Sequence, residues 1–335
     1  LSSVDKCLRF RDLDLVKREL QYFLDQKVPQ VKFVDRTFNC RHGHEKEIWK
    51  YVLEHDNGIT NFHFEVSADL LNEEELELIS RMRPGLIQLE IGVQSTNPDT
   101  IREIKRTMNF ERLSEVVKKI KAMGNTHQHL DLIAGLPYEG YESFGQSFDD
   151  VYGLMPDQLQ LGFLKVLKGS YMQEHAEEYG LVYKGKPPYE VLGTSWLSYG
   201  EIAQLKKIEE MVEVYYNSGQ FANTLRFLVK EFASPFRMYE KLSGYYEEKG
   251  LFGRSHTRTA RYEILLDFIG ENVKGKTKFY RELLVYDLYL RENIKSRPEF
   301  AGESLADKEF LKAFYDREEK EPVYLKSYEK ADSRK

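Results

Sequence analysis

Short runs of β-forming residues alternate with helical segments over the first half of the chain. Each run is followed by residues whose apolar positions recur at helical spacing. Several helical segments begin or end at capping residues, among them Asn72, Pro98 and Gly124. Strand–helix alternation repeated five times predicts an α/β fold with parallel strands and crossover helices. The expected strands span residues 31–35, 62–67, 86–94, 129–135 and 158–164.

The β signal fades after about residue 195, where amphipathic helices take over. Leu205, Ile208, Met211, Val212 and Tyr215 form one apolar stripe, which predicts a packed core seam. We therefore expect an α/β region over residues 1–195 and a helical region over 196–335, ending in a frayed polar tail from residue 320. The expected helices span 202–216, 223–232, 237–249, 259–269 and 278–293.

Four of the expected strands alternate polar and apolar residues, whereas fully covered parallel strands are apolar throughout. Period-two geometry places each polar set on one side of its strand. The polar sets are His63, Glu65 and Ser67; Gln88, Glu90 and Gln94; His129 and Asp131; and Gln158, Gln160 and Gly162. Burying such groups without partners costs several kcal/mol each. An open, partial barrel with a wet interior explains the pattern, and a sandwich with one solvated face is the alternative.

Composition narrows the class of protein. The 335 residues are 41% hydrophobic and 31% charged, as in a globular protein, and contain no apolar run of membrane-spanning length. The net charge of −6 gives no electrostatic footprint for nucleic acid. Two cysteines, Cys7 and Cys40, exclude a disulfide framework. We expect a cytoplasmic protein that binds neither membrane nor nucleic acid.

Active sites of parallel α/β folds lie at the carboxyl ends of the strands. The polar residues expected there are Asp35, Ser67, Asp69, Gln94, Ser95, Glu139 and Lys165. Asp35 also suits a turn, and Asp69 and Asn72 also suit helix capping. His42 and His44 suggest a metal motif, but no third ligand has suitable spacing. The residues alone thus predict a domain with a polar interior that binds a charged, medium-sized ligand.

Four segments together resemble the radical S-adenosylmethionine superfamily. Residues 33–39, 90–95, 131–139 and 163–170 are similar to its second, fourth, fifth and sixth strand segments, and their order and spacing agree. The resemblance is to the cobalamin-associated branch with an uncharacterised helical carboxyl-terminal region. The anaerobic magnesium-protoporphyrin monomethyl ester oxidative cyclase is a relative in that branch. The similarity covers residues 1–185, and the helices after it resemble the same branch.

This resemblance implies a partial (β/α) barrel that binds S-adenosylmethionine and a four-iron cluster. Electron transfer then yields an adenosyl radical that takes hydrogen from a small-molecule substrate. By position, Asp35 contacts the methionine amine, and Arg106 pairs with the carboxylate. The ribose and carboxylate are surrounded by Glu65, Ser67, Gln94 and Ser95. The adenine is lined by Gly135, Leu164 and Lys165. The substrate faces His63, Glu90, His129, Asp131 and Gln160.

The sequence departs from the family at the cluster ligands. The family's Cys-x3-Cys-x2-Cys motif, expected just before residue 1, is absent from the chain. We therefore expect a fragment that lacks the first strand, cluster loop and catalytic residues, and that is inactive with no cofactor bound. The full-length enzyme is expected to use S-adenosylmethionine, a 4Fe-4S cluster and an electron donor protein, with cobalamin and the substrate left open.

The residue chemistry leaves two other functions open. A metal-dependent barrel hydrolase would use His63, Glu65, His129 and Asp131 as ligands and bases. A non-catalytic scaffold would use the tyrosine-rich helices of residues 200–295 to bind a partner, because tyrosine offers large apolar area with one polar tip.

Overall fold

Five parallel strands form one sheet in chain order. The computed structural model describes residues 8–41, 43–292, 294, 297–303 and 306–324. The strands are β1 (Gln30–Lys32), β2 (Asn61–Val66), β3 (Ile87–Gln94), β4 (His127–Ala134) and β5 (Gln158–Phe163), each paired in parallel with the next. The predicted half-barrel sheet of five parallel strands is therefore confirmed, and the sandwich alternative is wrong.

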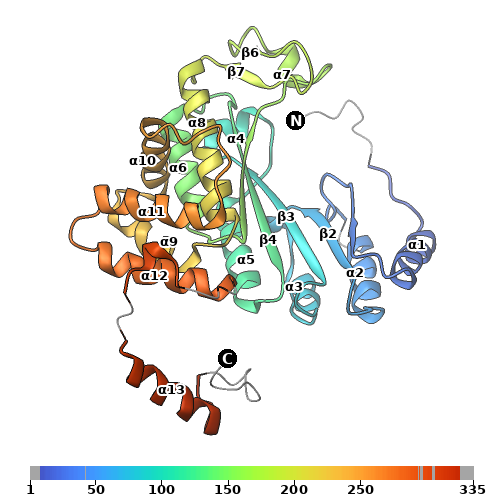
Figure 1. Ribbon diagram of the computed structural model, residues 1–335. Helices are drawn as coiled ribbons and strands as arrows, with labels where there is room; N and C mark the ends of the chain where they lie inside the picture. The colour runs from blue at the N-terminus through green and yellow to red at the C-terminus, as the bar shows by residue number, and fades with distance from the viewer. Residues whose placement is uncertain (1–7, 42, 293, 295–296, 304–305, 325–335) are drawn as a thin grey trace. The chain divides into compact units, whose positions relative to one another are not determined.

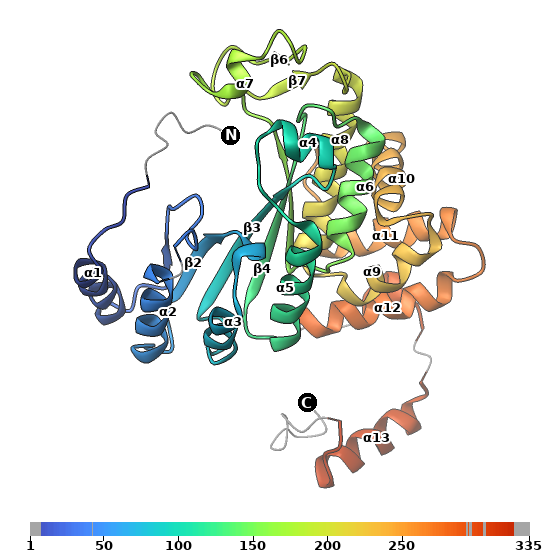
Figure 2. The same ribbon diagram turned by 180° about the vertical axis from the view of Figure 1, so that it is seen from behind.

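The crossover helices lie on one face of this sheet. Figure 2 shows α2 (His44–Glu54), α3 (Glu73–Ser80), α5 (Phe110–Met123) and α6 (Tyr141–Tyr152) in front of the strands. Figure 1, from the opposite side, shows β2, β3 and β4 in front of them. In β3 the side chains toward the helices are fully buried, and Gln88, Glu90 and Gln94 on the other face are partly exposed. The alternation of the sequence thus separates an apolar core from a polar face.

Local capping explains where the helices start and stop. Asp12 caps α1 (Leu13–Asp25), and Asn72 forms a capping box with Glu75 at the start of α3. Asn97 caps α4 (Pro98–Glu103), which begins with a proline. Gly124 ends α5 at a φ of +71°, a left-handed conformation that glycine adopts without steric cost. These sequence signals set the ends of the helices.

A segment between the sheet and the later helices was not predicted. It contains α7 (Tyr171–Glu174) and a small antiparallel pair, β6 (Val182–Tyr183) and β7 (Val191–Gly193). The backbone N–H of Val191 donates to the Leu164 carbonyl at 2.8 Å, and that of Val166 donates to the Tyr189 carbonyl at 2.9 Å. These bonds tie β7 to the end of β5.

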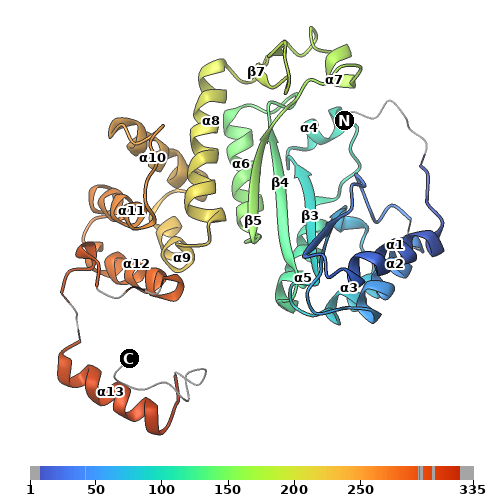
Figure 3. The same cartoon turned by 45° about the vertical axis from the view of Figure 1, so that its right-hand side comes forward.

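The predicted helical region is confirmed. It continues with α8 (Tyr199–Met211), a π-helical turn η2 (Val212–Asn217), α9 (Ala222–Leu228) and α10 (Pro235–Glu248). Figure 3 shows α8 beside α6 and α10. The stripe predicted for the helix over 202–216 is buried throughout, from Leu205 on α8 to Tyr215 on η2, so its role in the core is also confirmed. These helices belong to the first compact unit, Leu1–Arg254.

The second compact unit is Ser255–Lys335, and the boundary at 195 stays a prediction. This unit contains α11 (Arg258–Asn272), α12 (Thr277–Arg291) and α13 (Lys308–Lys320), the last of which was not predicted. The expected polar tail falls largely outside the described residues. Among the helices that the structure describes, none combines the length and apolar character needed to cross a bilayer.

The edge of the sheet at β5 is covered by η2 through one side chain. The Leu159 backbone N–H donates to Asn217 Oδ1, and Asn217 Nδ2 donates to the Leu159 carbonyl, both at 2.9 Å. The amide therefore takes the place of a neighbouring strand, which satisfies backbone groups that an edge leaves unpaired.

Asn217→Ala is expected to lower the free energy of unfolding by about 1–3 kcal/mol, because it removes both bonds from a partly buried edge. Denaturant unfolding measures the change. The control is Gln146→Ala, because the Gln146 amide is exposed and bonds to Asp150 on its own helix. It should change stability by less than about 0.5 kcal/mol. Equal effects of the two variants would contradict the role of Asn217.

Candidate functional site

Polar side chains from all five strands lie side by side on the face opposite the crossover helices. The register pairs Lys32 with His63, Glu65 with Glu90, Glu90 with His129, and Asp131 with Gln160. The polar face is defined here as Lys32, His63, Glu65, Glu90, His129, Asp131 and Gln160. The predicted substrate residues are thus brought together, with Lys32 added by the structure.

Glu90 is the central charge of the polar face. Its Oε2 lies 3.0 Å from Lys32 Nζ and 2.9 Å from His63 Nε2. Burial raises the pKa of Glu90, but contact with Lys32 outweighs it and the pKa is lowered overall. Glu65 lies 3.6 Å from the same Lys32. Its pKa is raised by burial and by the neighbouring charge of Glu90. The face therefore holds carboxylates of unequal acidity around one ammonium group.

A second pair lies on β4, where His129 Nε2 is 3.0 Å from Asp131 Oδ1. Burial raises the pKa of Asp131, against the contact with His129, which lowers it. Neither this contact nor that of His63 with Glu90 has hydrogen-bond geometry. The Nε2 atoms of both histidines and Asp131 Oδ1 make no hydrogen bond within the described residues. These buried atoms keep a hydrogen-bonding direction for a ligand.

The carboxyl end of β3 is a strained turn that places Gln94 and Arg106. Gln94 has a φ of +74°, which is uncommon for a residue with a side chain. A Cβ on Gly92 would lie 2.5 Å from Gln94 Nε2, so a larger residue there would displace this amide from its observed position. Arg106 Nη2 donates to the Gly92 carbonyl, and its Nε has no hydrogen-bond partner within the described residues.

Arg106 also belongs to the charge balance of the site. Burial lowers the pKa of its guanidinium, while the carboxylates of Asp69 and Asp131 raise it. Ser67 Oγ donates to Asp69 at 3.0 Å, and Asp69 Oδ2 accepts from the Asn109 backbone N–H at the start of α5. Gln94, Arg106, Ser67 and the polar face therefore meet at the carboxyl ends of β2, β3 and β4.

Asp35 lies apart from this group, exposed in the loop after β1. It lines a cavity of about 700 Å³ between α1 and β1. Lys32 lines the same cavity and also bonds Glu90, so it links the cavity to the polar face.

Ser95 faces a different environment from the one expected of a ligand group. It is fully buried, and its hydroxyl donates to Glu139 Oε1 at 2.6 Å. Ser147 Oγ donates to the same oxygen at 2.8 Å. Burial raises the pKa of Glu139 to about 7, although both hydroxyl bonds lower it. This network joins the loops after β3 and β4 to α6.

The residues predicted to line adenine lie under β7. Gly135 and Leu164 are buried, and a Cβ on Gly135 would lie only 2.7 Å from Val191 Cγ1. Lys165 is exposed and forms an antiparallel bridge with Glu190. The carboxyl end of β4 is therefore closed by a segment of the unpredicted hairpin. The predicted role of these three residues in binding adenine stays a prediction.

Metal ligation is not favoured by the arrangement of side chains. Among the described residues, no three histidine, cysteine or acidic side chains are placed to hold one ion. His63 instead pairs with Glu90, Glu65 lies beside Lys32, and His129 pairs with Asp131. The hydrolase alternative is therefore not favoured. His42 and Cys7 lie outside the described residues.

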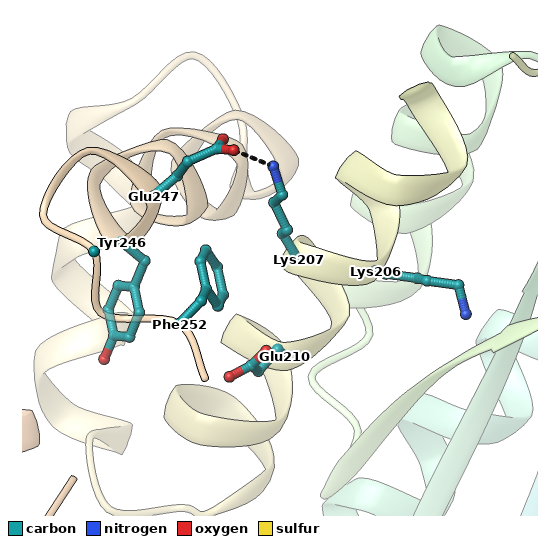
Figure 4. A pocket seen from close by; sticks show the side chains of 7 residues that line it. Lys206, Lys207, Glu210, Tyr246, Glu247 and Phe252 are labelled. Carbon is teal, nitrogen blue, oxygen red and sulfur yellow. Dashed lines mark hydrogen bonds and ion pairs between the residues drawn. The ribbon is translucent and has the colours of Figure 1, made fainter. Parts of the chain in front are cut away.

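Figure 4 shows a second cavity, of about 370 Å³, between α8 and α10. Tyr246 and Phe252 form an aromatic wall, and Lys207 pairs with Glu247 at 2.6 Å across the rim. Lys206 points away from it and pairs with Glu190. No residue of the predicted site lines this cavity.

Three residues of the site were missed by the sequence interpretation. Lys32 alternates with Val31 and Phe33, so the period-two pattern of the strand expected over residues 31–35 would place it on the polar face. Asn39 holds the backbone of Ser67 by two bonds of 2.9 Å. Neither Asn39 nor Val191 carries a sequence signal, because their contacts join distant parts of the chain.

Residues 3–151 match the radical SAM superfamily. This match supports the predicted superfamily for the region that carries the polar face. Residues 177–335 match a family described as a protein of unknown function, DUF4080. The cobalamin branch and the cyclase relative gain no support from these two matches.

The curated relatives cover the radical SAM region in part. The chain is 32% identical over 107 residues to the oxygen-independent coproporphyrinogen III oxidase of Salmonella typhimurium. It is 28% identical over 111 residues to the oxygen-independent coproporphyrinogen-III oxidase-like protein HemZ of Bacillus subtilis. These matches cover 30% and 33% of this chain. The chain spans only 23% and 22% of the length of these relatives.

Similar solved structures include radical SAM enzymes. The methyltransferase TsrM from Kitasatospora setae, with cobalamin and a [4Fe-4S] cluster bound, has a TM-score of 0.45 and 18% identity over 53% of this chain and 33% of that chain. Coproporphyrinogen III oxidase from Escherichia coli has a TM-score of 0.42 and 19% identity over 63% of this chain and 48% of that chain.

Proposed function

We propose that the polar face and the adjacent end of β3 form the S-adenosylmethionine and substrate site of a radical SAM enzyme. The observation that carries this proposal is the meeting of Gln94, Arg106 and the acidic polar face inside the region that matches the superfamily. When bound with a reduced iron–sulfur cluster, S-adenosylmethionine supplies hydrogen-atom abstraction.

The residues of the site fit the charges of S-adenosylmethionine. Its ammonium and sulfonium groups are positive, and Glu65 and Glu90 offer carboxylates that Lys32 only partly neutralises. Its carboxylate suits Arg106, whose Nε has no hydrogen-bond partner in the described part of the chain and can donate to an anion. Gln94 offers an amide that hydrogen-bonds to ribose hydroxyls. These side chains would bind and orient the molecule.

We restrict the expectation that the chain binds no cofactor to the cluster, and propose that S-adenosylmethionine itself still binds weakly. Saturation-transfer NMR with S-adenosylmethionine added at millimolar concentration tests this. Arg106→Gln is expected to weaken binding about fivefold or more, because it removes a charged partner of the carboxylate. Arg102→Gln is the matched control, since Arg102 is exposed on α4 and pairs with Asp99. Absence of binding, or equal weakening by both variants, would refute the proposed site.

The residues of the chain do not fit the iron–sulfur cluster. A cluster of this family takes three cysteine ligands, and the sequence has only Cys7 and Cys40. We propose that the chain by itself holds no cluster and is inactive. Anaerobic reconstitution with iron and sulfide is expected to leave less than one iron per chain, by elemental analysis. Four irons per chain would refute this.

The finer assignment concerns the reaction. We propose that the enzyme is cobalamin-linked, with oxidative cyclase-like or methyltransferase-like activity on a small molecule. The support is the resemblance of residues 33–39 and 90–95 to that branch. The chain has only two cysteines, which suits the reducing cytoplasm. We propose that an electron donor protein reduces the enzyme there.

A further inference from the structure

The two histidines of the polar face have opposite surroundings. His129 on β4 faces Glu90 in register on β3, and its Nε2 lies 3.0 Å from Asp131 of its own strand. The other groups around it are two glutamines and two histidines. They are Gln158, in register on β5; Gln160, the partner of Asp131; His127 on β4; and His63 on β2. Two carboxylates at this position favour the protonated form of His129.

His63 on β2 shares its carboxylate with a cation. Its Nε2 lies 2.9 Å from Glu90 Oε2, which also binds Lys32 Nζ at 3.0 Å. Lys32 is its register partner on β1, and Gln88 is its register partner on β3. Glu65, two residues along β2, binds the same ammonium. A buried imidazole beside a lysine favours its neutral form.

We propose that His63 and His129 are a proton-transfer pair for a substrate bound against the polar face, with His129 donating a proton and His63 accepting one. His129 gives its proton to a heteroatom of the substrate and becomes neutral. His63 takes a proton from an O–H, an N–H or a carbonyl-activated C–H and becomes an imidazolium. The two transfers conserve charge and need no oxidant. The inference rests on the proposed function only for the place where the substrate lies.

Geometry leaves both rings ready for this role. Each histidine is only 7% exposed, and each Nε2 lies within 3.0 Å of a carboxylate oxygen without meeting hydrogen-bond geometry within the described residues. A well-aligned hydrogen bond from a ligand would therefore improve on the contact that each nitrogen now makes.

The pKa directions agree with the assigned roles. Burial and the charge of Lys32 lower the pKa of His63, against the contact with Glu90. Burial also acts to lower the pKa of His129, but Asp131 and Glu90 outweigh it and the pKa is raised. Two titrating groups whose environments move their pKa values apart are the arrangement that assigns an acid and a base.

Histidine titration by NMR tests the pair without cofactor or substrate. In the chain labelled at histidine Cε1, the resonances that vanish in His63→Gln and His129→Gln identify the two rings. We expect His129 to bind its proton more tightly than His63, so that the titration midpoint of His129 lies at the higher pH. Equal midpoints, or a higher midpoint for His63, would overturn the proposal.

Two variants test which neighbouring charges make the proton affinities of His63 and His129 different. Lys32→Met is expected to tighten proton binding by His63 several-fold, whereas Asp131→Asn is expected to weaken proton binding by His129. Lys46→Met is the matched control, because Lys46 pairs with Glu74 between α2 and α3 and should move neither midpoint. A shift of His63 equal in Lys32→Met and Lys46→Met would overturn the role of Lys32. If the chain does not bind S-adenosylmethionine but His129 still binds its proton more tightly than His63, the proposed function is refuted and the proton-transfer pair is not.

Discussion

Glu139→Gln is expected to make the stability of the protein less dependent on pH. In the unaltered protein, ionisation of Glu139 should lower the free energy of unfolding by about 3 kcal/mol between pH 4.5 and pH 7, and the variant should lack this decrease. Glu139 is fully buried, and one of its oxygens, Oε2, makes no hydrogen bond within the described residues. Burial disfavours the carboxylate, so the folded protein keeps Glu139 protonated to a pKa of about 7.

The direction of this pH effect follows from the protonation of Glu139 in the folded and in the unfolded chain. Below pH 4.5 the carboxyl is protonated in both the folded and the unfolded chain, and its contribution is complete. Between pH 4.5 and 7 only the unfolded chain loses the proton, which favours unfolding. Above pH 7 both states are ionised and the loss is constant. Glutamine keeps an oxygen for Ser95 and Ser147 but has no charge to lose.

Denaturant unfolding at a series of pH values measures this, and the difference between variant and unaltered protein isolates Glu139 from other titrating groups. Glu54→Gln is the control, since Glu54 is exposed at the end of α2. Its difference curve should stay flat. A flat curve for Glu139→Gln as well would show that the carboxyl is not held protonated.

Local signals made the fold predictable. The strands, the crossover helices and the stripe on α8 follow from residue periodicity and from caps such as Asn72 and Gly124. Such signals depend on residues close together in the chain, so they can be recognised from a single sequence without knowing the fold. The hairpin of β6 and β7 has strands of two and three residues, too short for periodicity to reveal.

The sequence predicted only those site residues whose position follows from the alternation of side chains along a strand. Alternation placed His63, Glu90 and Asp131 on a common face, but it could not show that Lys32 joins Glu65 to Glu90. Nor could it show that Ser95 turns toward Glu139, because the strand ends at the left-handed Gln94 and the alternation stops there. Contacts beyond the strand ends depend on loops, which carry no period.

Gly135→Ala is expected to lower the free energy of unfolding by about 3 kcal/mol or more. Two costs add at this position. Gly135 has a φ of +89°, where a side chain is strained, and the new Cβ would lie 2.7 Å from Val191 Cγ1. Val191 is fully buried, so it cannot move aside without disturbing β7 and its bond to Leu164.

A second substitution and a control separate the two costs. Val191→Ala removes the methyl groups that the new Cβ would meet, so the double variant should lose at least about 1 kcal/mol less than the sum of the single variants. Gly124→Ala has a similar φ of +71° with no atom near the new Cβ, so it should show the backbone cost alone, about 1–2 kcal/mol. Denaturant unfolding measures all four variants. Additive losses at positions 135 and 191 would mean that β7 does not press on the end of β4, and the surface there would then be free for a ligand.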